Sequence, residues 1–253
     1  MAYINYKIKQ GIGFLKFNRP EKYNAFNQEL LQELHSLLKN QATNPALKVL
    51  LISGEGKAFS SGVDLKVLLD LKNVEQARNF ALLLENTSEL IYNFPKPSIA
   101  LLNGLALGGG LGYATAADLR IMSTEAKIGY PAVKLGAILP ATCTMYLKSL
   151  VGDGHTKDLL LTGRMINAET ALQIGLTNYI TQPVQLMDRA VELANQIMEA
   201  PELALAYTKN TVNFTTKRDI ETIKLYAADN FAFLSQTKEW QKRMQAFADK
   251  KKK

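Results

Sequence analysis

Three consecutive glycines, Gly108 to Gly110, follow an apolar segment in the middle of this 253-residue chain. A backbone without Cβ atoms lets a ligand approach N–H groups that side chains would otherwise cover. If a helix begins at this turn, the same N–H groups lie at the positive end of its dipole. The cluster therefore indicates a site for an oxyanion, while close packing between a helix and a strand explains the glycines equally well.

The sequence lacks other motifs that would assign a chemistry to this region. The dinucleotide-binding pattern G-x-G-x-x-G fails because Tyr113 occupies its last position, and neither a phosphate-binding loop nor a G-x-S-x-G nucleophile turn occurs. With one cysteine, Cys143, and two histidines, the chain cannot form a disulfide framework or a Cys/His zinc site. Cys143 is expected to be a buried packing residue, with a nucleophile as the alternative. We expect no metal or redox cofactor and a reducing, cytoplasmic compartment.

The charge of the chain does not indicate a polyanionic partner. The net charge is +7, but Lys250–Lys253 supply four of these charges and leave +3 for the rest. A tail of lysines alone lacks the arginines and aromatic residues that grip bases. The N-terminus alternates as a strand does, and glycines and Pro97 interrupt the longest uncharged stretch, residues 97–117. We therefore expect no nucleic acid and no membrane partner.

The elements that must position the glycine cluster alternate between strand and helix, which predicts an α/β fold. Apolar runs and alternation predict strands at residues 3–9, 13–18, 49–52, 98–102 and 119–123. Helical spacing predicts a helix capped by Asn27 and helices at 65–71, 74–94 and 109–117. From Ala141 onward we expect helix over nearly the whole sequence, at 142–151, 155–162, 168–174, 186–199, 203–214, 219–235 and 238–250. We divide the chain into an α/β core, residues 1–195, and a C-terminal helical region, residues 196–253.

Three segments in this order and spacing resemble the enoyl-CoA hydratase/isomerase, or crotonase, family. They are NRPEKYNAF at residues 18–26, AFSSGVDL at residues 58–65 and NGLALGGG at residues 103–110. The resemblance implies a spiral of ββα units whose C-terminal helices form a trimerisation region, assembled as a homotrimer or hexamer. It also implies an acyl-CoA partner, with the coenzyme A thioester as substrate and no separate cofactor.

The resemblance assigns roles to particular residues. The backbone N–H groups of Val63 and Gly109 match the family's oxyanion hole, which binds the thioester oxygen as an enolate develops. Asp64 matches an acid that holds its loop. The segment that lies along the CoA nucleotide, together with a serine near the adenine, corresponds to Glu21, Lys22, Tyr23 and Ser61.

The sequence departs from the family where hydratases carry their two glutamates. These positions fall on Gly112 and Ala132, and a third position, an aspartate in some members, falls on Pro140. Adding water across a conjugated double bond needs two proton transfers, so the two-glutamate mechanism is not expected here. We predict that Tyr130 or Thr142, which are nearby, carries the protons instead. Tyr113, Cys143 and Lys66 are further candidates, and each of the five residues also has a structural explanation.

The sequence therefore predicts an acyl-CoA-processing enzyme of this family, a lyase or isomerase, that stabilises a thioester enolate without the usual glutamates. The alternative is a non-catalytic acyl-CoA-binding or scaffold protein with the same fold. Both hypotheses depend on the same backbone donors and differ only in whether a proton carrier is present.

Overall fold

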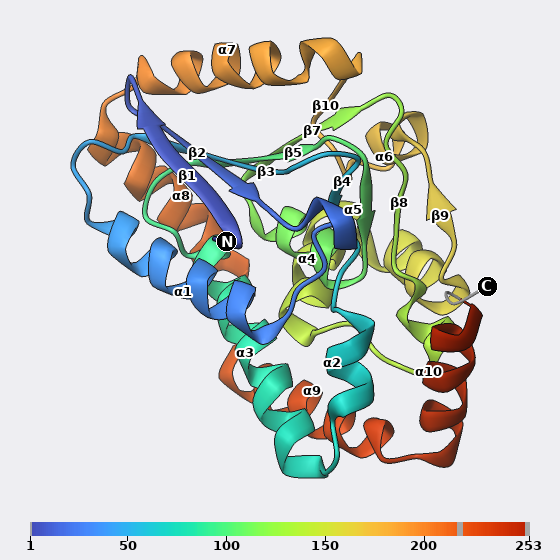
Figure 1. Cartoon of the computed structure of the whole chain (residues 1–253). Helices are drawn as coiled ribbons and strands as arrows, with labels where there is room; N and C mark the ends of the chain where they lie inside the picture. The colour runs from blue at the N-terminus through green and yellow to red at the C-terminus, as the bar shows by residue number, and fades with distance from the viewer. Residues whose placement is uncertain (1, 217–219, 251–253) are drawn as a thin grey trace.

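The computed structural model describes residues 2–216 and 220–250 and shows a spiral of β–β–α units (Figure 1). In three successive units, the first strand joins a six-stranded sheet and the second joins a four-stranded sheet. This arrangement confirms the mixed α/β class and the spiral predicted from the sequence.

The six-stranded sheet has the order β1-β2-β3-β5-β7-β10. Only β1 and β2, which form an N-terminal hairpin, are antiparallel, and every other neighbouring pair is parallel. The six strands are β1 Ile4–Lys9, β2 Ile12–Phe17, β3 Val49–Gly54, β5 Ser98–Leu102, β7 Leu119–Ser123 and β10 Tyr179–Thr181. The four-stranded sheet consists of β4 Ala58–Ser60, β6 Leu105–Leu107, β8 Ile128–Gly129 and β9 Met165–Ile166.

The helices agree with the predicted ranges to within a few residues. The first part of the chain forms η1 Pro20–Lys22, α1 Gln28–Ala42, α2 Leu65–Asp70, α3 Val74–Tyr92, α4 Gly109–Ala116 and η2 Pro131–Leu135. The second part forms α5 Ala141–Thr162, α6 Ala168–Gln173, η3 Pro183–Gln185, α7 Leu186–Met198, α8 Glu202–Thr216, α9 Ile220–Ser235 and α10 Lys238–Lys250. The side chain of Asn27 accepts a hydrogen bond from the Leu30 N–H, as a cap does.

Two short strands after Ala141 were not predicted. β9 and β10 interrupt the helices of this region, and β10 extends the larger sheet beside β7. Strands of two or three residues are too short to show an alternating pattern. The two helices predicted at 142–151 and 155–162 are confirmed as the two halves of α5, which a kink separates at Gly152, whose φ of 72° is not helical.

Helices cover both faces of the six-stranded sheet (Figure 1). On one face, α7 packs Leu186, Ala190 and Leu193 against β3, β5 and β7. The main core lies on the other face, among α1, α3, α4 and α5. Because β3 is buried on both faces, its first four residues, Val49–Ile52, form an uninterrupted apolar run.

The last two helices pack back onto α2 and α3. Phe231 of α9 and Trp240 and Met244 of α10 form a separate core with Leu68 and Ala77. The predicted boundary at residue 195 remains a prediction, and α7 runs through it to Met198. In the described ranges, no helix is long and apolar enough to cross a bilayer.

Candidate functional site

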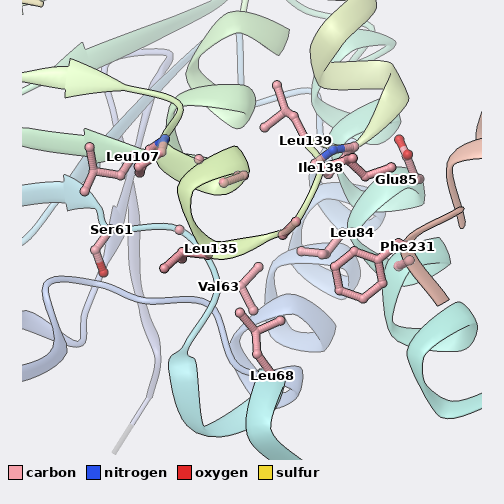
Figure 2. A pocket seen from close by; sticks show the side chains of 18 of the residues that line it. Ser61, Val63, Leu68, Leu84, Glu85, Leu107, Leu135, Ile138, Leu139 and Phe231 are labelled. Carbon is pink, nitrogen blue, oxygen red and sulfur yellow. The ribbon is translucent and has the colours of Figure 1, made fainter. Parts of the chain in front are cut away.

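A cavity of about 110 Å³ lies where the four-stranded sheet meets the beginning of α4. Figure 2 shows its lining, with Ser61 and Leu107 at one end, Glu85 and Phe231 at the other, and Val63 between them. Most of the lining is apolar and comes from α2, α3, the loop before α5 and the C-terminal helices. The lining side chains of these elements include Leu68, Ala81, Leu84, Leu135, Ile138, Leu139 and Trp240.

Two backbone segments meet at the cavity. Gly108 has a φ of +51° and directly precedes α4, whose first residue is Gly109. Gly62 has a φ of +88°, and a Cβ atom there would lie 2.8 Å from the Leu107 carbonyl oxygen and 3.4 Å from the Gly109 nitrogen. Glycine is therefore required at residue 62 both for its dihedral angle and for this close approach.

The N–H groups of Val63 and Gly109 are free to bind a ligand. Both residues line the cavity. Within the described part of the chain, neither N–H donates a hydrogen bond to protein. Gly109 also lies at the N-terminus of α4, where the helix dipole favours negative charge. This pair can therefore hold an oxyanion without displacing an internal hydrogen bond.

The backbone around Val63 is held on both sides. The Phe26 N–H donates to the Gly62 carbonyl at 2.7 Å, and the Asp64 N–H donates to the Phe26 carbonyl at 2.9 Å. The Asp64 carboxylate accepts from the Lys66 N–H at 3.0 Å and from Arg19 Nη2 at 3.0 Å. Asp64 thus caps α2 and fixes its loop, the role that the resemblance implied for it.

The residues predicted to contact the CoA nucleotide gather near the Ser61 end of the cavity. The Ser61 N–H donates to the Tyr23 carbonyl at 2.9 Å, and Ser61 Oγ donates to the Lys22 carbonyl at 3.4 Å. Glu21 and Lys22 form the exposed helix η1, and Tyr23 is 52% exposed. The structure therefore brings these four residues together on a surface beside the cavity.

The sequence reasoning missed Glu85, a carboxylate of α3 that lines the far end of the cavity. Its side chain is buried and accepts hydrogen bonds from the N–H groups of Ala141 and Thr142 and from the Thr142 hydroxyl. Burial raises the pKa of Glu85, while the hydrogen bonds from Thr142 and Ala141 and the Lys224 cation oppose this rise. The available signal was an acidic residue on the apolar face of an amphipathic helix.

A sequence model of the family described as enoyl-CoA hydratase/isomerase matches residues 7–253. The chain belongs to this family. Crotonyl-CoA hydratase of Syntrophomonas wolfei subsp. wolfei is 36% identical over 255 residues, which cover 100% of this chain and 98% of that protein. Short-chain-enoyl-CoA hydratase of Clostridium acetobutylicum is 32% identical, with 96% of this chain and 94% of the relative covered. The crystal structure of enoyl-CoA hydratase from Bacillus anthracis matches with a TM-score of 0.82 at 29% identity, covering 98% and 97% of the two chains.

In this member of the enoyl-CoA hydratase/isomerase family, the three positions without a carboxylate have different surroundings. Ala132 and Pro140 line the cavity. Gly112 is not among the residues that line the cavity, and an added Cβ atom there would be 2.4 Å from Cys143 Sγ and 2.8 Å from Cys143 Cβ. Cys143 therefore occupies the space that a side chain at residue 112 would need.

Tyr130 and Thr142, the residues predicted to carry protons, do not line the cavity. Tyr130 is fully buried, and burial raises the pKa of its phenol. Thr142 donates its hydroxyl to Glu85 at 2.5 Å. Cys143 is also fully buried, which raises the pKa of its thiol to about 12 and accords with the expected packing role. Direct proton transfer by Tyr130 or Thr142 remains a prediction.

Proposed function

We propose that this chain stabilises the enolate of a CoA thioester with the N–H groups of Val63 and Gly109. The supporting observation is that two donors with no hydrogen-bond partner among residues 2–216 and 220–250 meet at the edge of an apolar cavity. Such donors act strongly on the charge that develops in the transition state, and the loss of one typically costs about 3 kcal/mol. This proposal assigns enolate stabilisation, one step of the family's chemistry, to two specific N–H groups of this chain.

The type of reaction that this chain can catalyse depends on which of its side chains can transfer protons. The names of the relatives favour hydration of a short enoyl-CoA. Gly112 and Ala132, which match the positions of the hydratase glutamates, cannot activate water. We therefore propose enolate chemistry on an acyl-CoA thioester without that glutamate pair. The vacancies at these two positions also favour the alternative, a non-catalytic acyl-CoA-binding protein.

A panel of acyl-CoA thioesters tests both hypotheses. Mass spectrometry would follow water addition, double-bond isomerisation, decarboxylation and thioester hydrolysis, while calorimetry measures binding of each thioester. Turnover of at least one short-chain thioester is expected. Binding without turnover of any thioester would support the non-catalytic alternative, and the absence of binding would contradict both.

Cavity size indicates a short acyl chain. An apolar cavity of 150 Å³ holds a benzene molecule, so a cavity of about 110 Å³ accepts only a smaller group. Phe231 forms the far end, and its ring meets the Trp240 ring edge-on at a centroid distance of 5.5 Å. We propose that this aromatic pair limits the length of the acyl chain.

Phe231→Ala is expected to shift the preference toward longer acyl chains, because it opens the end of the cavity. The ratio of kcat/KM for 2-octenoyl-CoA to that for crotonyl-CoA should rise by about 10-fold or more. Phe233→Ala is the matched control, since Phe233 lies on the same helix and is 70% exposed. An unchanged ratio in folded Phe231→Ala would show that Phe231 does not set the chain length.

The nucleotide of CoA is proposed to lie along Glu21, Lys22, Tyr23 and Ser61, which share the surface beside the cavity.

We also propose a homotrimer or hexamer assembled through the C-terminal region, residues 196–253. Exposed apolar side chains on α8, Leu203, Tyr207 and Val212, support an interface there. Sedimentation of the purified chain should give a mass of three or six protomers, and a monomer would contradict this assembly. A cytoplasmic location, and the lack of a cofactor beyond the thioester, remain predictions.

A further inference from the structure

Glu85 is the one ionisable side chain among the described residues that line the cavity. It lies at the end opposite Ser61, beside Phe231 (Figure 2). A thioester that enters past Ser61 and places its oxygen on Val63 and Gly109 therefore directs its acyl chain toward Glu85. The carboxylate is thus placed to meet carbons of the acyl chain rather than the CoA nucleotide.

Residues on α5 fix the orientation of the Glu85 carboxylate. Oε1 accepts from the Ala141 N–H at 2.7 Å, and Oε2 accepts from the Thr142 N–H at 3.0 Å and from the Thr142 hydroxyl at 2.5 Å. The residue before these donors is Pro140, the third position without a carboxylate. A carboxylate can accept about four hydrogen bonds, so these three leave capacity for a substrate proton.

The ionisable groups around Glu85 are less suited than Glu85 to exchange a proton with a ligand. Cys143 and Tyr146 face it from α5 and Tyr113 faces it from α4, and burial raises the pKa of all three, which keeps them neutral. Lys224 of α9 is the cation near Glu85, and its Nζ atom is bound to Glu89 and Glu221. Among the described residues that line the cavity, Glu85 is the side chain that can take up or release a proton.

We propose that Glu85 is the catalytic acid/base of this chain, accepting a proton from a carbon of the acyl chain and returning it. This inference rests on the proposed function. The C–H bond breaks, its proton goes to a Glu85 carboxylate oxygen, and its electron pair delocalises onto the thioester oxygen held by Val63 and Gly109. The reverse transfer reforms a C–H bond at the same carbon or at a conjugated one. No oxidant, reductant or second substrate is required.

Deuterium exchange in D₂O tests this step without knowledge of the physiological substrate. Butyryl-CoA reports exchange at the carbon next to the thioester, and crotonyl-CoA reports exchange at the terminal methyl conjugated to it. Wild type is expected to incorporate deuterium into at least one of them, and Glu85→Gln should slow that exchange by about 10²-fold or more. Calorimetry should find butyryl-CoA binding unchanged within about threefold, since Val63 and Gly109 are untouched.

Glu89→Gln is the matched control for this substitution. Glu89 lies on the same helix, binds Lys224 at 2.8 Å and is not among the residues that line the cavity. Its exchange rate should stay close to that of wild type. Equal exchange in wild type and Glu85→Gln, or a wild type that binds butyryl-CoA but exchanges neither probe, would overturn the proposal for Glu85 alone. A wild type that binds no thioester would overturn the proposed function as well.

Thr142→Val provides a second test that does not depend on the folding of Glu85→Gln. The hydroxyl of Thr142 stabilises the charged carboxylate, so its removal raises the pKa of Glu85 further. Because the base must be ionised to accept a proton, the acidic limb of the exchange-rate profile should move to higher pH. A hydroxyl that only held α5 in place would change the stability of the chain but leave this limb where it is.

Discussion

Gly109→Pro is expected to reduce turnover of the best acyl-CoA substrate by about 10²–10³-fold, because it deletes one of the two oxyanion donors. Gly109 is the first residue of α4, where a proline fits the helical φ and has no intrahelical hydrogen bond to lose. Folding should therefore survive better than activity. Single-turnover measurements on the best thioester, with circular dichroism of the variant, provide the readout.

Gly109→Ala is the control for this prediction. Outside its chain neighbours and the backbone of its own helix, a Cβ atom at residue 109 would meet no described atom within 4 Å, and the alanine keeps its N–H group. Its activity should lie well above that of Gly109→Pro. A folded Gly109→Pro variant that turns over substrate at the wild-type rate would remove Gly109 from the oxyanion site.

Gly112→Glu alone is expected to lower the free energy of unfolding by about 3 kcal/mol or more. The reason is steric and electrostatic. A Cβ atom at residue 112 would overlap Cys143 Sγ and Cβ, at 2.4 and 2.8 Å, and the carboxylate would be forced into a buried site. Urea denaturation of the variant beside wild type measures the loss.

Cys143→Gly removes both atoms that obstruct residue 112. In a double-mutant cycle, the pair should be more stable than the sum of its single changes by about 1–3 kcal/mol. Adding Ala132→Glu to this pair should raise the hydration of crotonyl-CoA by about 10²-fold over wild type, whereas Gly112→Glu/Ala132→Glu without Cys143→Gly should not. Additive single effects would show that Cys143 does not control this position.

Much of the molecule could be predicted from the sequence because its signals are local. Asn27 caps a helix, the apolar run of β3 forms a buried strand, and α4 begins within the glycine cluster at 108–110 as expected. The short strands of the smaller sheet could not be predicted, because two or three residues are too few to show a periodic pattern. Their positions depend on pairing with distant segments.

The acyl end of the site depends on contacts between segments that are distant in the sequence. The sequence marks Glu85 only as an acidic residue on the apolar face of α3, and its hydrogen bonds to the start of α5 are visible only in the structure. Phe231 carries no motif, and it reaches the cavity because α9 packs along α3. For Gly112, the sequence shows that the glutamate is absent. Only the structure shows that Cys143 fills the space that a side chain at residue 112 would need.

The packing of α9 and α10 against α2 and α3 also has a consequence for biosynthesis. The segments that carry Val63 and Gly109 leave the ribosome well before the helices that carry Phe231 and Trp240. The oxyanion donors are therefore synthesised while the acyl cavity still lacks its end wall. The aromatic pair that we propose to limit acyl-chain length is thus the last part of the site to be made.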